Sequence, residues 1–155
     1  MYYTRYRPSP SIVRAGMDGS SPATIVYGLS DAYGIAIDYE TSRLFWADHS
    51  AKKIQSSSLD GGDKRVEVQL STNGPYGMAL FDNTMIWGNY DGFALQQREA
   101  ADGAVVRSLY TGSSTIRHIA VIPPDNLPTD RTNHCAGNNC SKICVLTTSS
   151  FRCVS

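Results

Sequence analysis

Short runs of apolar and aromatic residues alternate with turn-forming residues along the first 120 positions of the chain. The runs GIAI (34–37), LFWA (44–47) and KIQSSSL (53–59) are rich in β-branched or aromatic residues and are bounded by Asp, Gly, Asn and Ser. This pattern is typical of strands joined by tight turns. No segment shows the period of an amphipathic helix. The sequence therefore predicts an all-β chain.

The same pattern recurs with a period of about 42 residues. YGIAIDYETSRLFWAD (33–48) is followed by the similar YGMALFDNTMIWGN (76–89), and RHIAVI (117–122) stands where a third copy is due. Three Asp-Gly pairs keep this spacing, at residues 18–19, 60–61 and 102–103. Asp-Gly suits a hairpin turn because glycine accepts a positive φ without steric cost.

Each repeat has room for about four strands once a strand around RVEVQL (65–70) is added. Four-stranded units of 40 to 45 residues are typical of β-propeller blades, whose apolar faces are covered by neighbouring blades. The alternative is an ordinary β-sandwich whose strands resemble one another by coincidence.

Length and charge limit the function classes. A chain of 155 residues can bury one ordinary core, or a small core plus an appended module. Fourteen basic residues balance fourteen acidic ones, so the net charge does not call for nucleic acid as a partner. No apolar run reaches the roughly 18 to 20 residues of a transmembrane helix, so we expect no membrane insertion by this segment.

All four cysteines lie near the C-terminus, at Cys135, Cys140, Cys144 and Cys153. Their crowding predicts three regions: blades over 1–122, a turn-rich linker over 123–133 and a small module over 134–155. Disulfides would stabilise such a module and require an oxidising compartment. Zinc is the competing interpretation, but the spacing contains no CxxC pair. The sequence leaves three disulfide pairings open.

The repeats resemble the YWTD repeats of the low-density lipoprotein receptor family, and the tail resembles the EGF-like module that follows each YWTD propeller there. FWAD (45–48) matches the signature well, and IWGN (86–89) and YYTR (2–5) match it in part. The resemblance covers nearly all of residues 2–153. It implies a partial propeller of about two and a half to three four-stranded blades of six, followed by a truncated, disulfide-rich EGF-like module.

The resemblance also assigns roles to individual residues. It implies disulfides between Cys135 and Cys144 and between Cys140 and Cys153. It places tryptophans between blades and an aspartate in a buried hydrogen-bond network, and Asn89 would keep an acceptor there but lose the charge. The signature-like positions are Tyr3, Phe45, Trp46, Asp48, Trp87 and Asn89.

No catalytic motif is present: the chain contains no GxSxG, HExxH, P-loop or dinucleotide fingerprint. We therefore predict no catalytic residue, cofactor or metal, and a chain that is not an enzyme. The competing class is a metal-dependent six-bladed hydrolase, for which Asp38, Glu40 and Asp48 are the nearest approach to a carboxylate cluster.

Two of the three histidines belong to the repeats. We interpret His49, after FWAD, and His118, in place of the glycine of YGIAI, as blade-surface residues. Members of the resembled family release ligand in acidic endosomes, and histidine changes charge between pH 5 and 8. His118 is accordingly the candidate pH-sensing residue.

The resemblance implies an extracellular protein-interaction module of a lipoprotein-receptor-like cell-surface receptor. Such a module would bind a lipoprotein, Wnt-pathway or matrix protein, in endocytic uptake with acid-dependent release or as a Wnt co-receptor. The chain would lie outside the plasma membrane as part of a single-pass receptor, with the remaining blades supplied by a longer parent chain. The alternative is a secreted nidogen-like matrix protein.

Overall fold

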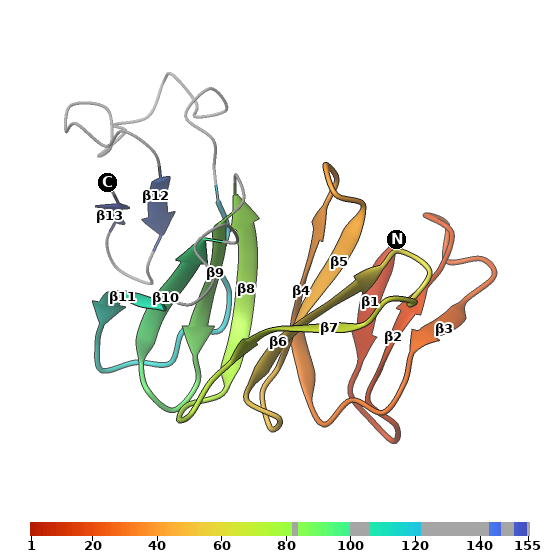
Figure 1. Ribbon diagram of the computed structural model, residues 1–155, viewed down its shortest axis with the longest axis horizontal. Helices are drawn as coiled ribbons and strands as arrows, with labels where there is room; N and C mark the ends of the chain where they lie inside the picture. The colour runs from red at the N-terminus through yellow and green to blue at the C-terminus, as the bar shows by residue number, and fades with distance from the viewer. Residues whose placement is uncertain (82–83, 100–105, 122–142, 147–150, 155) are drawn as a thin grey trace.

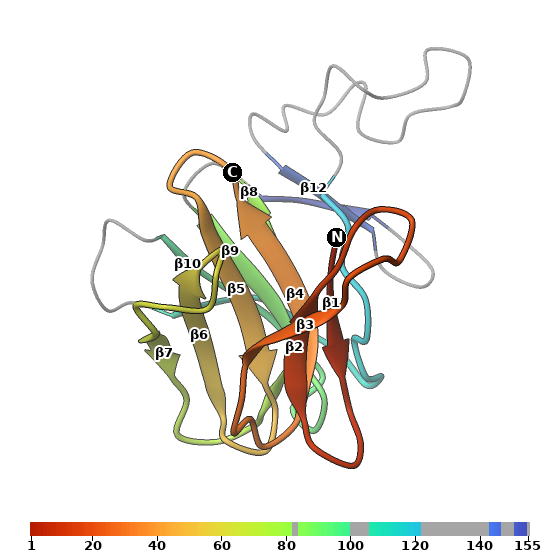
Figure 2. The same cartoon turned by 90° about the vertical axis from the view of Figure 1, so that its right-hand side faces the viewer.

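The computed structural model describes residues 1–81, 84–99, 106–121, 143–146 and 151–154. Every regular element in these ranges is a β-strand, as the sequence predicted. The strands form three antiparallel sheets, which lie side by side in Figure 1 and one behind the other in Figure 2, and a separate two-stranded hairpin. The Asp102-Gly103 turn, the linker and most of the cysteine-rich tail lie outside the described residues.

Strands that follow one another in the sequence are neighbours in each sheet. Blade 1 contains β1 (Tyr2–Arg5), β2 (Ser11–Arg14) and β3 (Ala23–Val26). Blade 2 contains β4 (Ala32–Asp38), β5 (Arg43–Asp48), β6 (Lys53–Ser58) and β7 (Arg65–Gln69). Blade 3 contains β8 (Pro75–Phe81), β9 (Thr84–Asn89), β10 (Ala94–Glu99) and β11 (Arg107–Thr111). The hairpin is β12 (Ile143–Leu146) with β13 (Phe151–Val154).

The sequence repeat corresponds to the blade. FWAD lies on β5 and IWGN on β9, the second strand of blades 2 and 3, and the strand expected around RVEVQL is β7. Register agrees as well, because Trp46 lies opposite Gln55 on β6 and Trp87 lies opposite Gln96 on β10. The expected four strands per unit are confirmed in blades 2 and 3, whereas blade 1 has three.

The core lies between the blades. Trp46 is 0% exposed and belongs to an apolar cluster with Ile12 and Val26 of blade 1. Trp87 is also 0% exposed and packs in a second cluster with Phe45 and other residues of blade 2. Each tryptophan therefore fills the junction with the preceding blade, which is where propellers bury their apolar area.

Tyr3 occupies the corresponding position on β1, and its environment differs. The Tyr3 residue is 41% exposed. On the same strand Arg5 takes the place of the motif aspartate, and its guanidinium donates to the hydroxyls of Ser11 at 3.1 Å and Thr24 at 3.0 Å. In blade 1, the residue at the aspartate position therefore makes its hydrogen bonds to the other two strands of the same sheet.

Asp48 ties β5 to the loop that enters β4. Its carboxylate accepts hydrogen bonds from the backbone amides of Ser30 at 3.1 Å and Asp31 at 2.9 Å, and from the Gln55 amide at 3.5 Å. The residue is 1% exposed. Such charge-assisted bonds to a buried carboxylate are stronger than neutral ones.

Asn89, its counterpart on β9, makes a smaller network. The side-chain amide of Asn89 donates to Gln96 Oε1 at 2.8 Å, and Trp87 Nε1 donates to the same oxygen at 3.2 Å. Asn89 Oδ1 is buried without a partner among the described residues. Asn89 thus lacks the charge of Asp48. Its hydrogen bond goes to Gln96 on the next strand, whereas Asp48 also accepts from the backbone of the loop before β4.

Glycines let the first strands of neighbouring blades approach closely. A Cβ on Gly34 of β4 would lie 2.6 Å from Tyr76 O and 2.7 Å from Met78 N on β8. A Cβ on Gly77 would lie 2.3 Å from Arg117 O. Backbone atoms cannot rotate away as a side chain can, so these positions require glycine.

Gly34→Ala is expected to push β4 away from β8 and to lower the free energy of unfolding by about 1–3 kcal/mol, the usual cost of overpacking. Urea denaturation of the purified chain measures it. Gly62→Ala is the control, because its Cβ would meet only the side-chain oxygens of Ser58 and Asp60, at 3.2 and 3.3 Å. Equal stability of the two variants would contradict the close approach of β4 and β8.

Candidate binding face

Five aromatic rings gather at one end of the three blades. Tyr33 and Tyr76 are the second residues of β4 and β8, and Tyr6, His49 and Tyr90 directly follow β1, β5 and β9. Within a blade, the start of β4 or β8 lies beside the finish of the antiparallel strand β5 or β9. Equivalent strands run in the same direction in each blade, so these ends meet on one face of the three blades. We call these five residues the aromatic cluster.

Four tyrosines of the cluster form a row across the blade junctions. Tyr33 and Tyr76 are stacked with ring centroids 4.0 Å apart and planes at 21°. Tyr6 stacks with Tyr33 at a centroid distance of 5.7 Å, and the Tyr90 centroid lies 5.3 Å from that of Tyr76 with the planes at 30°. Aromatic pairs at these separations contribute roughly 0.5–1.5 kcal/mol each beyond their buried area.

His49 packs edge-on against this row. Its ring centroid lies 6.1 Å from Tyr33, 6.1 Å from Tyr76 and 5.6 Å from Tyr90, at interplanar angles of 75°, 76° and 82°. Nε2 of His49 lies 3.6 Å from Asp91 Oδ2 and has no hydrogen-bond partner among the described residues. The sequence placed His49 on a blade surface, and the structure places it between three tyrosines.

The environment of Tyr33 favours the neutral form of its hydroxyl. Burial raises the pKa of the Tyr33 phenol well above its ordinary value, and neighbouring Tyr6 and the negative charge of Asp31 raise it further. The Tyr33 hydroxyl donates to Asp31 Oδ2 at 3.3 Å, and Ser50 donates to the same oxygen at 3.2 Å. The Tyr33 ring is therefore presented uncharged, with its hydroxyl held by Asp31.

A cavity of about 450 Å³ opens beside the stacked pair. Tyr33 and Tyr76 line one part of it, and Arg117 and His118, both exposed, line another. The Arg117 guanidinium carbon lies 6.0 Å from the Tyr90 ring centroid, within the range of a cation–π contact. His118, the candidate pH-sensing residue, thus lines the same cavity as Tyr33 and Tyr76.

The three carboxylates considered from the sequence are not brought together. Asp48 is buried at the end of β5 nearest the cluster, whereas Asp38 and Glu40 lie at the opposite end of blade 2, where β4 turns into β5. The Thr41 hydroxyl lowers the pKa of Asp38 by donating to it at 2.5 Å. The described residues contain no group of three or more His, Cys, Asp or Glu side chains placed to hold a metal ion.

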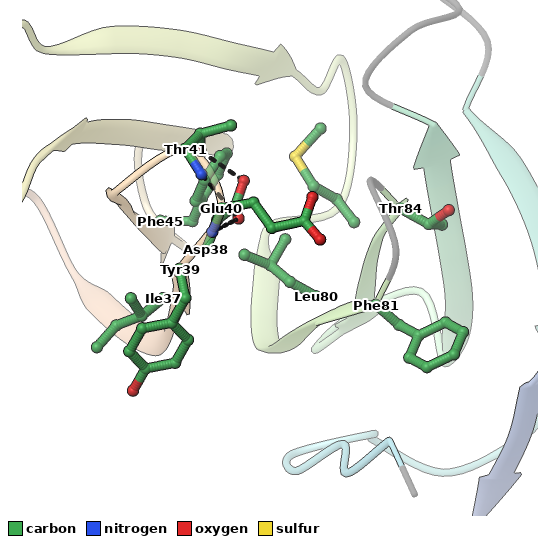
Figure 3. Close-up of a pocket in the computed structure, with 10 residues that line it drawn as sticks. Ile37, Asp38, Tyr39, Glu40, Thr41, Phe45, Leu80, Phe81 and Thr84 are labelled. Carbon is green, nitrogen blue, oxygen red and sulfur yellow. Dashed lines mark hydrogen bonds between the residues drawn. The ribbon is translucent and has the colours of Figure 1, made fainter. Parts of the chain in front are cut away.

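A second cavity, of about 250 Å³, lies at that opposite end. Figure 3 shows Glu40 and the hydrogen-bonded pair Asp38 and Thr41 on one side and the apolar side chains of Leu80 and Phe81 on the neighbouring blade. Asp38 uses its oxygens within its own turn, since it accepts from the backbone amides of residues 40 and 41 as well as from the Thr41 hydroxyl.

The cysteine predictions fall mostly outside the described residues. Within them, β12 and β13 are paired with Cys144 opposite Cys153. Cys135, Cys140 and the side chains of all four cysteines are not described, so the pairing of Cys135 with Cys144 and of Cys140 with Cys153 stays a prediction.

Comparison with known proteins gives clear relatives. No known family's sequence profile matches the chain. It is 30% identical to a vitellogenin receptor of Solenopsis invicta over 152 residues, covering 94% of this chain and 8% of that receptor. It is also 30% identical to the low-density lipoprotein receptor-related protein 5 of Homo sapiens over 147 residues, covering 93% of this chain and 9% of that protein. The chain therefore spans less than a tenth of these relatives.

The fold agrees with a solved propeller. In a nidogen/laminin complex the nidogen propeller is 25% identical with a TM-score of 0.64, and the match covers 71% of this chain and 44% of that one. The three sheets and their aligned motif strands define a partial YWTD-type β-propeller. With the receptor relatives, they show that the chain belongs to the low-density lipoprotein receptor family.

Two further structural neighbours overturn the prediction that the chain is not an enzyme. A luciferin-regenerating enzyme (11% identity, TM-score 0.64, 72% of this chain and 40% of that one) has a similar fold. A gluconolactonase from Xanthomonas campestris also has a similar fold (15% identity, TM-score 0.60, 72% of this chain and 38% of that one). Propellers of this shape include enzymes, so the fold and missing motifs were insufficient grounds for that prediction. At these identities the likeness shows the fold alone.

The described part of the chain contains no helix of the length and apolarity needed to cross a membrane.

The aromatic cluster was missed at the sequence level, although a signal for it exists. An aromatic residue directly follows the motif in all three repeats: Tyr6 after YYTR, His49 after FWAD and Tyr90 after IWGN. Together with the tyrosine that opens the YGIAI and YGMAL runs, at 33 and 76, this recurrence identifies all five rings.

Proposed function

We propose that the aromatic cluster is a protein-binding face and that the chain is an extracellular recognition module of a lipoprotein-receptor-like cell-surface protein. The observation that supports this most directly is the row of four tyrosines across three blades. Tyrosine and other aromatic residues are enriched at protein interfaces, because a rigid ring buries apolar area at little entropic cost. Loops on a rigid scaffold are the usual place for such sites.

Exposure and shape support a binding role for the cluster. The Tyr6 residue is 44% exposed, and Tyr33, His49, Tyr76 and Tyr90 are partly exposed. The neighbouring cavity gives the face a concave part in which a ligand side chain can be desolvated. Concave sites with a few polar groups are typical of ligand recognition.

The relatives suggest what kind of ligand to test. By its name, one relative is a receptor for vitellogenin, and others are low-density lipoprotein receptor-related proteins. We therefore propose an extracellular protein ligand, such as a lipoprotein or a Wnt-pathway protein, and a place outside the plasma membrane in a single-pass receptor. The nidogen propeller in a laminin complex favours a matrix ligand as the second candidate.

The finer features of this proposal come from the family. Blades over 1–122, a linker over 123–133 and an EGF-like module over 134–155 would form one unit with the remaining propeller blades of a longer chain. In endocytic uptake, His118 beside the cavity would be the pH-sensing residue, because a change in its charge alters the electrostatics of the ligand site. Its exposed position at the cavity supports testing that role.

Tyr76→Ala is expected to weaken ligand binding by tenfold or more, because it removes the ring at the centre of the row, and central aromatic residues are typical hot spots. Surface plasmon resonance of the chain against immobilised vitellogenin and laminin measures the effect. Tyr39→Ala is the matched control: Tyr39 is 82% exposed and lies in the turn after β4, away from the cluster.

Binding to vitellogenin that is lost in Tyr76→Ala and kept in Tyr39→Ala supports the receptor proposal. The same result with laminin alone supports the matrix candidate. An equal loss in the two variants, or unchanged binding in Tyr76→Ala, would show that the cluster is not the binding face. Circular dichroism of each variant verifies that the blades remain folded.

A further inference from the structure

At the cavity, the copy of the YGIAI pattern that begins at Arg117 differs from the two copies before it. Tyr33-Gly34 and Tyr76-Gly77 occupy the same position in consecutive repeats, and the third repeat has Arg117-His118 there. The tyrosines therefore form an aromatic wall of the cavity, while the third repeat contributes a guanidinium and an imidazole.

The Arg117 charge is not neutralised within the described part of the chain. No ion pair joins it to a carboxylate there, and its guanidinium carbon lies 6.0 Å from the centroid of the Tyr90 ring. The carboxylates of Asp31 and Asp91 contact residues of the aromatic cluster instead. Asp31 accepts from Tyr33 and Ser50, and Asp91 faces His49 at 3.6 Å.

The backbone holds this cation beside the rings. Gly77 permits the contact, since a Cβ there would lie 2.3 Å from Arg117 O. The result is a cavity of about 450 Å³ with an aromatic wall and an exposed guanidinium that forms no ion pair with the described residues. Arginine binds carboxylates through two parallel hydrogen bonds and stacks on aromatic faces, so one ligand group can use both features.

We propose that this cavity receives an aspartate or glutamate side chain from within a peptide segment of the ligand. Arg117 binds the carboxylate, and the flanking peptide lies along Tyr33 and Tyr76. An internal residue fits better than a chain end because the row continues past the cavity to Tyr6, which gives the peptide a surface to follow. This inference rests on the proposed binding face and specifies the chemistry that it selects.

Blocked pentapeptide pools test the inference without knowledge of the natural ligand. Three pools are titrated into the chain by calorimetry: a fixed central aspartate, a fixed central asparagine of the same shape, and a free C-terminal carboxylate with no acidic side chain. The aspartate pool is expected to bind at least tenfold tighter than the asparagine pool. This preference should decrease as salt is added, because it depends on charge.

Substitutions of Arg117 test whether this residue causes the preference for the aspartate pool over the asparagine pool. Arg117→Gln is expected to abolish the tenfold preference for aspartate, and Arg117→Lys to retain part of it, since lysine keeps the charge but not the fork. Arg107→Gln is the control, as Arg107 is an exposed arginine on β11 that does not line the cavity.

Three outcomes would overturn the inference: equal binding of the aspartate and asparagine pools, a preference that survives Arg117→Gln, or tighter binding of the free C-terminal carboxylate. The proposed function is judged separately, by the effect of Tyr76→Ala on vitellogenin or laminin binding. If that effect is present while the aspartate preference is absent, the binding face stands and the acidic ligand does not.

Discussion

Replacing Trp46 by alanine is expected to lower the free energy of unfolding by about 3–5 kcal/mol, as large truncations of buried aromatic residues do. Trp46 is 0% exposed and fills the junction between blades 1 and 2, against Ile12 and Val26. Its removal leaves a void lined by side chains fixed on two separate sheets, which cannot collapse without moving a blade. Urea denaturation followed by far-ultraviolet circular dichroism measures the loss.

Two control variants show whether the loss of stability in Trp46→Ala comes from the empty blade junction. Trp46→Phe keeps an aromatic ring in the junction and should cost less than half as much. Tyr27→Ala removes an aromatic residue that is 70% exposed and should change stability by less than about 0.5 kcal/mol. A Trp46→Ala variant as stable as Tyr27→Ala would mean that the blades are not joined through this side chain.

Asp48→Ala is expected to destabilise the chain by about 2–3 kcal/mol, because the backbone amides of Ser30 and Asp31 lose their acceptor and Gln55 loses its partner. Asn89→Ala, its counterpart one repeat later, should cost about 1 kcal/mol, since the Asn89 side-chain amide donates a single hydrogen bond, to Gln96. Chemical denaturation of both variants gives the difference directly.

Asp48→Asn separates charge from shape. It should lie between the wild type and Asp48→Ala, because the amide keeps one acceptor oxygen but places an NH₂ group opposite a backbone donor. If Asp48→Ala and Asn89→Ala were equally stable, the loop entering β4 would not depend on the carboxylate, and the two motif positions would be energetically equivalent.

The sequence predicted the blades because their constraints are local and repeated. Trp46 and Trp87 are 41 positions apart, in runs of the same pattern, and the requirement for a large apolar residue at each blade junction is visible without coordinates. Strand existence follows from the alternation of apolar runs and turns. The four strands of blades 2 and 3 were predicted on this basis.

The binding face was harder to predict because it depends on proximity between residues far apart in the sequence. Tyr33 lies on β4 and His49 directly follows β5, and their contact follows from the antiparallel direction of these two strands. His49 was interpreted as a blade-surface residue, and its contacts with three tyrosines have no signal in the sequence next to it. The role of Arg117 depends on Gly77 in the preceding repeat, a constraint that only the close approach of two backbones reveals.

The placement of the two tryptophans also gives the molecule a separate optical reporter for each blade junction. Trp46 senses the junction of blades 1 and 2, and Trp87 senses that of blades 2 and 3. Their indole groups differ, since Trp87 Nε1 donates to Gln96 and Trp46 Nε1 has no partner among the described residues. Neighbouring units of a repeat protein can separate one junction at a time. Emission from single-tryptophan variants would therefore show which junction opens first under denaturant, and whether the ring of blades loosens from one side.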